Sequence, residues 1–144
     1  MGTSFDEVID IATLKINDYS LKKLYENSKK GFETFCDGLL IVAIPNFTLC
    51  KQDLTYDKKN RCFNATLSIS EVSILADLWC MAWMSREVDN KAQFQGKLQS
   101  SGSFKNHSEA QNLKEKTIRL DKMREQVYQK ITDYLLEDIS NITI

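Results

Sequence analysis

Residues 68–84 read SISEVSILADLWCMAWM, and the part from Val72 to Met84 is apolar nearly all the way round a helix. Ser68 and Glu71 have the spacing of a capping box, in which two side chains satisfy backbone N–H groups at a helix start. A helix that is apolar on every side needs other elements around it. This stretch therefore predicts the central helix of the protein.

Asp77 is the one charged residue between Val72 and Met84. A buried carboxylate needs a hydrogen-bond donor or a raised pKa, and either can mark a functional site. A contact between helices or between subunits is the simpler interpretation, and we favour it. The enzymatic alternative, in which Asp77 or a cysteine thiol reacts, predicts a ligand pocket beside Trp79 and Trp83.

Further helices are predicted on the N-terminal side of this stretch. A capping-box pair followed by apolar residues at helical spacing predicts a helix over residues 5–14. Residues 18–28 fit either a short helix or an ordered connector. A second buried helix runs from residue 29 to Pro45, which limits the preceding residue to extended geometry or a kink. Gly38 weakens that helix by about 1 kcal/mol relative to Ala, which suggests that another element packs closely there.

Two predicted features interrupt the helices. Residues 53–66 hold two short apolar runs about a polar turn, which predicts a small β-hairpin that lies on the helices or pairs with another chain. Residues 95–107 are rich in turn-forming residues and predict a long loop. Leu98 and Phe104 are large apolar residues within this predicted loop. They fit anchors onto the protein's own core or onto a partner.

The C-terminal part predicts the longest helix. From Ser108 onward, apolar residues keep one face of a helix for about 28 residues, or roughly 42 Å, so part of the helix should project beyond the core. Residues 136–144 then form an apolar tail after a helical domain of residues 1–135. The predicted fold class is mainly α: a helical bundle with one small β-hairpin and a long C-terminal helix.

The charges are balanced overall and uneven along the chain. Lys and Arg total 19 against 20 Asp and Glu, so no global field holds nucleic acid or an anionic membrane. Residues 1–18 are acidic and residues 105–130 are basic, each by three charges. These segments could meet head to tail between copies, although two solvated helix faces are the simpler interpretation. The start lacks the pattern of a signal peptide, and the apolar stretch 39–44 is too short to span a membrane.

Motifs that carry chemistry are missing from the sequence. The four cysteines are spaced too widely for a zinc-binding pair, and His107 is the single histidine. The sequence contains no glycine-rich phosphate loop and no nucleophile motif. We therefore predict no enzymatic activity, no catalytic residue, no metal site and no cofactor.

The chain resembles head-tail connector (neck) proteins of tailed phages that infect low-GC bacteria. The resemblance is carried by residues 100–116 (SSGSFKNHSEAQNLKEK), 35–38 (FCDG) and 46–51 (NFTLCK) within the helical order described above, and it spans most of the chain. It implies an adaptor subunit that forms a ring, typically of twelve copies, under the portal at the capsid vertex. Such adaptors extend the DNA channel and hold the portal with a C-terminal segment.

The resemblance implies several partners and two sets of contact residues. The partners are other copies of the chain, the portal protein, the next neck or tail-completion protein, and duplex DNA that passes without sequence-specific binding; no membrane is expected. The expected location is the virion neck, and the host cytoplasm during assembly. We assign the portal contact to Tyr134, Leu135, Ile139 and Ile142, and the contact between subunits to Tyr56, Phe63, Leu98 and Phe104. The alternative is a helical DNA-binding or genome-packaging accessory protein that uses Lys114, Arg119, Lys122 and Arg124.

Overall fold

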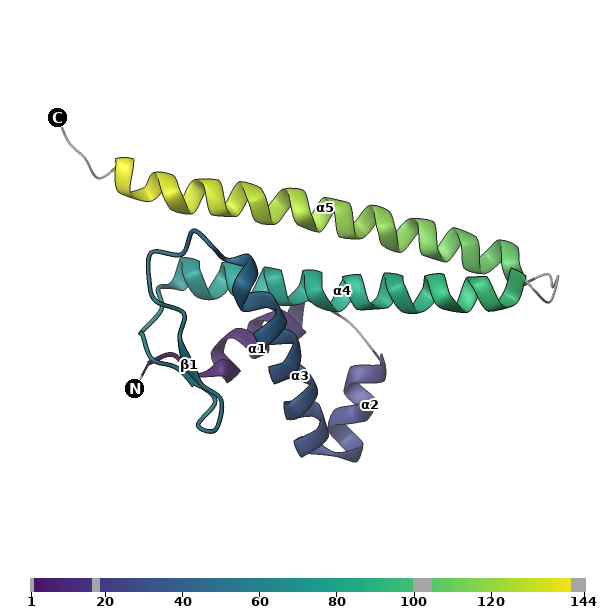
Figure 1. Ribbon diagram of the computed structural model, residues 1–144, viewed down its shortest axis with the longest axis horizontal. Helices are drawn as coiled ribbons and strands as arrows, with labels where there is room; N and C mark the ends of the chain where they lie inside the picture. The colour runs from purple at the N-terminus through teal and green to yellow at the C-terminus, as the bar shows by residue number, and fades with distance from the viewer. Residues whose placement is uncertain (1, 17–18, 100–104, 141–144) are drawn as a thin grey trace.

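The computed structural model describes residues 2–16, 19–99 and 105–140, and it confirms the mainly α fold class with a small hairpin and a long C-terminal helix (Figure 1). The elements in chain order are α1 (Phe5–Lys15), α2 (Tyr19–Asn27), α3 (Lys29–Ala43), the 3₁₀ helix η1 (Ile44–Asn46), β1 (Tyr56–Asp57), β2 (Cys62–Phe63), α4 (Ile69–Gln99) and α5 (Lys105–Ser140). Helix α4 is the centre of the fold because it packs against α1, α3 and α5.

The start of α4 has the predicted capping box. The backbone N–H of Ser68 donates to Oε1 of Glu71 over 2.7 Å, and the N–H of Glu71 donates to Oγ of Ser68 over 3.2 Å. Further along the helix, Trp79 is fully buried, and its indole Nε1 donates to the carbonyl oxygen of Cys36 on α3 over 2.9 Å. The prediction of a central helix is therefore confirmed.

Glu71 also joins α4 to α5. It is only 2% exposed, and its Oε2 accepts a hydrogen bond of 2.7 Å from the hydroxyl of Tyr134. That hydroxyl in turn accepts from the backbone N–H of Lys51 over 2.8 Å. Burial alone would raise the pKa of this carboxyl, but hydrogen bonds from Ser68, Tyr134 and Cys50 hold the pKa below its ordinary value of 4.5. Glu71 is therefore ionised at neutral pH and fixes the position of α5 along α4.

The N-terminal helices follow the sequence with two corrections. Helix α1 begins one residue after its cap Ser4, and residues 19–27 form the short helix α2 rather than a connector. The expected close packing at Gly38 is wrong, because a Cβ built there meets no atom within 4 Å. Of the two geometries expected for Ile44, extended or kinked, the extended one is wrong: Ile44 keeps helical angles, and Pro45 lies in the first turn of η1, where its missing N–H costs no hydrogen bond.

The predicted hairpin is confirmed, and it pairs with its own chain. Strands β1 and β2 are antiparallel, with Tyr56 opposite Phe63. Residues 2–5 run beside β2, and the N–H of Phe63 donates to the carbonyl oxygen of Thr3 over 2.7 Å. The Phe63 side chain is fully buried, and its ring centroid lies 5.3 Å from that of Phe5 on α1. The hairpin therefore lies on the helices, which is one of the two arrangements expected.

Arg61 fastens the hairpin to two helices. It follows the turn with a φ of 55°, in the left-handed region that non-glycine residues rarely adopt. Its guanidinium donates to both carboxylate oxygens of Asp37 on α3, over 2.7 and 2.9 Å, and to Asp6 on α1 over 2.8 Å. Hydrogen bonding to Asp37 raises the pKa of Arg61 further above its already high value. The charge of the partly buried Asp37 is thus neutralised by a bidentate ion pair with Arg61.

The long loop predicted over residues 95–107 is wrong, because α4 continues to Gln99 and α5 begins at Lys105. The helix formers Ala, Gln, Lys and Leu in residues 92–99 outweigh the single Gly96, which costs about 1 kcal/mol relative to Ala. The predicted tail over residues 136–144 is also shorter, because α5 runs through Ser140 and residues 141–144 lie outside the described part.

Helices α4 and α5 form a long antiparallel pair that extends beyond the rest of the protein. In Figure 1, α1, α2 and α3 lie below the pair, and the joined ends of α4 and α5 continue past them. The 36 residues of α5 correspond to about 54 Å of helix. Within the pair, Lys116 forms an ion pair of 3.1 Å with Glu87. The prediction that part of the last helix projects is therefore confirmed.

Replacing Glu71 by Gln tests the junction of α4 with α5. We expect Glu71→Gln to lower the free energy of unfolding at pH 7 by about 1–3 kcal/mol, because it removes a charged hydrogen-bond acceptor from buried donors. The folded-state pKa of Glu71 is depressed, so its contribution is complete above the unfolded value of 4.5 and disappears as the pH falls through the lower folded value.

Urea unfolding at several pH values measures this effect. The difference between the wild type and Glu71→Gln should shrink from pH 7 to pH 3. The exposed Glu125→Gln is the matched control and should show little change at any pH. An equal loss of stability at pH 7 and pH 3 would contradict the assignment.

Candidate functional site

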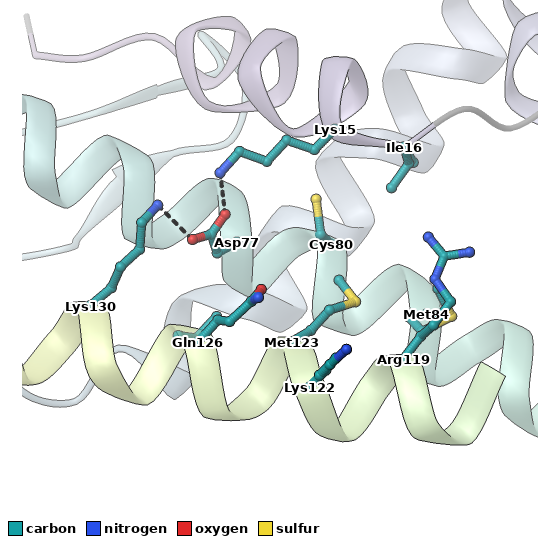
Figure 2. Close-up of a pocket in the computed structure, with 11 residues that line it drawn as sticks. Lys15, Ile16, Asp77, Cys80, Met84, Arg119, Lys122, Met123, Gln126 and Lys130 are labelled. Carbon is teal, nitrogen blue, oxygen red and sulfur yellow. Dashed lines mark hydrogen bonds and ion pairs between the residues drawn. The ribbon is translucent and has the colours of Figure 1, made fainter. Parts of the chain in front are cut away.

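A cavity of about 490 Å³ lies where the end of α1 meets α4 and α5 (Figure 2). This size falls among small-ligand pockets, which span about 300–1,000 Å³. Part of its wall is apolar and includes Ile16, Met84, Met123 and Val127. The polar part holds four basic side chains and a single acidic one. The cavity therefore combines an apolar wall with a net positive charge.

Asp77 joins three helices at one side of this cavity. Its Oδ1 pairs with Lys15 at the end of α1, and its Oδ2 pairs with Lys130 on α5 over 2.7 Å (Figure 2). The Asp77 side chain is 15% exposed, whereas those of the two lysines are about 40% exposed. The interpretation of Asp77 as a contact between helices is therefore confirmed.

Arg119 and Lys122 bring uncompensated positive charge to the same cavity. Both extend from α5, one turn apart, and neither forms an ion pair with another described residue. Figure 2 shows both side chains among the residues that line this cavity, together with Met84 and Met123. After Asp77 has paired with its two lysines, these are the cations left to attract an anionic group. The site is thus suited to a negatively charged partner that also carries apolar surface.

Among the described residues that line the cavity, Cys80 and Asp77 are the groups that the enzymatic alternative could use. Cys80 lines it, but burial raises the pKa of this thiol to about 12, so the thiol stays protonated at neutral pH and is a poor nucleophile. Its Sγ donates to the carbonyl oxygen of Ala12 over 3.4 Å. Neither Trp79 nor Trp83 lines this cavity, although the alternative predicts a pocket beside them.

A metal cluster and a membrane-spanning helix are both absent from residues 2–16, 19–99 and 105–140. There, no three His, Cys, Asp or Glu side chains are grouped so that they could hold a metal ion. None of the helices in the same residues has the length and apolar character that a membrane span requires.

A second surface lies at the other end of the α4–α5 pair. Ile69 at the start of α4 is 91% exposed, and Leu135 and Leu136 near the end of α5 are 36% and 49% exposed. The two helix ends are held together because Oγ of Ser70 donates to Oε1 of Glu137 over 2.9 Å. We call Ile69, Leu135 and Leu136 the apolar end. These three large aliphatic side chains are exposed at this end of the helix pair and are available to a partner.

The predicted portal contact is only partly exposed at this apolar end. Leu135 belongs to it, but Tyr134 is 3% exposed and has to be removed from the set, because its hydroxyl and ring belong to the core with Glu71 and Phe47. The Ile139 side chain and all of Ile142 lie outside the described residues. Ile69 was not among the predicted contact residues. The spacing of apolar residues in the sequence does not distinguish this exposed isoleucine at the helix start from the buried ones that follow it.

The predicted contact between subunits also needs correction. Phe63 is fully buried in the protein's own core, so it cannot meet a neighbour in this conformation. Tyr56 is 37% exposed and remains accessible beside the hairpin turn. The Leu98 side chain and all of Phe104 lie outside the described residues.

The four basic residues of the DNA-binding alternative do not share one face. On a helix with 100° per residue, Arg119 and Lys122 lie about 60° apart, but Lys114 lies about 110° and Arg124 about 170° from their midpoint. Arg124 also pairs with Asp121 over 3.3 Å. The structure instead groups Arg119 and Lys122 with Lys15 and Lys130 around the cavity. Helical spacing could have grouped residues 119, 122 and 130, but not Lys15, which comes from the opposite end of the sequence.

A scan of protein-family models and searches of curated proteins and of solved structures give no match to this chain.

Replacing Asp77 by Asn tests its role between the helices. We expect Asp77→Asn to lower the free energy of unfolding by about 1–2 kcal/mol, because Lys15 and Lys130 lose their shared partner and repel each other. Added salt should recover part of this loss by screening the repulsion. The exposed Asp121→Asn, which also removes an ion pair of α5, is the matched control. Thermal or urea unfolding should separate the two variants, and equal small losses would contradict the role of Asp77.

Proposed function

We propose that this chain is an adaptor subunit of the head-tail connector, or neck, of a tailed bacteriophage. In this role it forms a ring under the portal, continues the DNA channel and meets the next neck protein on the other side. The sequence resemblance suggests this class. The observation that carries the proposal in the structure is the apolar end, Ile69, Leu135 and Leu136, displayed at one end of a long helix pair.

The apolar end has the properties of a protein-docking surface. Fully burying an exposed Leu or Ile side chain contributes about 1.5–3 kcal/mol, so Ile69 can supply most of that amount, and the partly buried Leu135 and Leu136 a smaller share each. Their positions are fixed by the buried hydrogen bond between Tyr134 and Glu71, one turn or less from Leu135 and Leu136. A partner therefore meets a preorganised surface and loses little binding free energy to ordering it.

The charge distribution suits a channel wall. A ring that lets duplex DNA slide should not bind it strongly, and a net charge of -1 avoids the affinity that a strongly basic lining would give. The alternative of a DNA-binding accessory protein receives less support, because its four basic residues point in different directions on α5. Helix faces that alternate in charge attract phosphates weakly.

Light scattering with the portal protein encoded by the same genome tests this proposal. We expect the wild type to form a large complex with the portal, and Leu135→Asp/Leu136→Asp to lower the affinity by about a hundredfold, because two charges then face an apolar partner surface. Point substitutions are preferable to removal of the helix end after Asp133, because that truncation also removes the core residue Tyr134.

Ile118→Asp is the matched control, because Ile118 is 53% exposed on the same helix and away from the apolar end. It should bind the portal as the wild type does. A chain that ignores the portal but binds duplex DNA in a salt-dependent manner would overturn the adaptor proposal in favour of the DNA-binding alternative.

A further inference from the structure

The outer face of α1 carries an acidic and aliphatic stripe. Glu7, Asp10, Ile11 and Leu14 follow one another at the i, i+3, i+4 and i+7 spacing that puts them on one face of a helix. All four are exposed: Ile11 by 37% and Leu14 by 86%. The opposite face of α1, with Phe5 and its neighbours, is buried in the core. We call these four residues the α1 ridge.

The acidic residues of the α1 ridge have no partner within the described chain. Neither Glu7 nor Asp10 forms an ion pair with another described residue, whereas the adjacent charges Asp6 and Lys15 are paired with Arg61 and Asp77. Leu14 is exposed almost as fully as a side chain can be. A leucine at the end of an ordered helix, beside two unpaired carboxylates, is a surface that fits a basic and apolar partner.

The cavity between α1, α4 and α5 has the complementary chemistry. Arg119 and Lys122 are unpaired cations, and they are spaced i and i+3, as Glu7 and Asp10 are on the α1 ridge. Both spacings correspond to about 4.5 Å along a helix axis. The apolar wall around Met84 and Met123 offers space for an aliphatic side chain. Two acids and two aliphatic residues on one surface thus match two bases and an apolar hollow on another.

We propose that the α1 ridge of one copy docks in the cavity of a second copy, with Leu14 in the apolar hollow and Glu7 and Asp10 against Arg119 and Lys122. The occupant is a second copy because both complementary surfaces belong to the same chain and are present in equal number. Arranged head to tail, this contact leaves a free ridge and a free cavity at the two ends of a dimer, whereas a two-fold dimer would place each ridge in the cavity of the other copy. Repetition of such a contact gives a ring or a filament.

This inference deepens the proposed function, because it supplies the contact between neighbouring subunits, but the contact itself does not involve the portal. The aliphatic residues provide most of the attraction, since ion pairs between partly exposed groups are weak. The charges select the direction and register of docking. Reversal of charge on one surface should therefore oppose association, and reversal on both should restore it.

Sedimentation velocity of the full chain at low salt over a range of concentrations tests the contact. The wild type should associate as its concentration rises. Glu7→Lys/Asp10→Lys and Arg119→Glu/Lys122→Glu should each weaken association by about tenfold or more, because like charges then face each other. The variant with all four changes should regain association. Leu14→Ser should weaken association with no change of charge.

Lys58→Glu/Lys59→Glu is the matched control, since it makes the same change of charge at exposed positions in the hairpin turn and should associate as the wild type does. Circular dichroism verifies that each variant is folded, and Arg119→Gln/Lys122→Gln replaces the reversal if that variant does not fold. A wild type that stays monomeric at every concentration, or a fourfold variant that fails to recover, would overturn the contact.

The portal experiment tests the adaptor function and the sedimentation experiment tests the contact between copies, so a negative result in one does not decide the other. Leu135→Asp/Leu136→Asp should keep self-association while it loses the portal. If the chain self-associates but does not bind the portal, only the adaptor function is contradicted. If the chain binds the portal but the charge reversals leave its self-association unchanged, only this contact is contradicted.

Discussion

The buried carboxylate of Glu71 is the constraint on which the structure depends. It completes the capping box with Ser68 and accepts the hydroxyl hydrogen bond of Tyr134, so one charged group both starts α4 and positions α5. An ionised carboxylate stays in such a place only if donors surround it, and here the donors come from Tyr134 on α5 and from Cys50 and Ser68 in the segment between η1 and α4. The long pair of helices is therefore set at this end by polar geometry, and apolar packing and two ion pairs hold it further along.

Asp77 is a second junction, two turns further along α4. By pairing with Lys15 and Lys130 it pulls the end of α1 and the middle of α5 toward the same side of α4. Beyond this junction α1 ends, while α4 and α5 continue, so the side chains of Arg119 and Lys122 have no third helix to cover them. The cavity follows from that difference in helix length. Its positive charge follows because one carboxylate cannot neutralise all the cations around it.

The sequence predicted the features that depend on near neighbours. The capping box, the apolar run of α4, the start of α1 and the hairpin turn each involve residues a few positions apart. The loop over residues 95–107 failed because Gly96 and the serines weighed more in the composition than the helix formers around them. Tyr134 was assigned to the portal contact, yet it is buried, and its partners Glu71 and Lys51 are 63 and 83 residues away in sequence. The cavity could not be predicted, because it needs Lys15 and Arg119 to meet across the fold.

A protein that holds two partners in a fixed relative orientation needs rigid elements and two separate binding surfaces. The fold of this protein has a rigid helix pair and two such candidate surfaces. The apolar end and the cavity lie on the same pair of helices, at different distances from the Glu71 junction. Because α4 and α5 are fixed to each other by Glu71, Asp77 and the Lys116–Glu87 ion pair, a partner bound at one surface is held in a defined orientation relative to a partner at the other. The buried Cys80 thiol and the paired carboxylates belong to this frame. Burial in the helix packing raises the pKa of Cys80, and the hydrogen bonds that join the helices lower the pKa of Glu71, so both shifts follow from the packing itself.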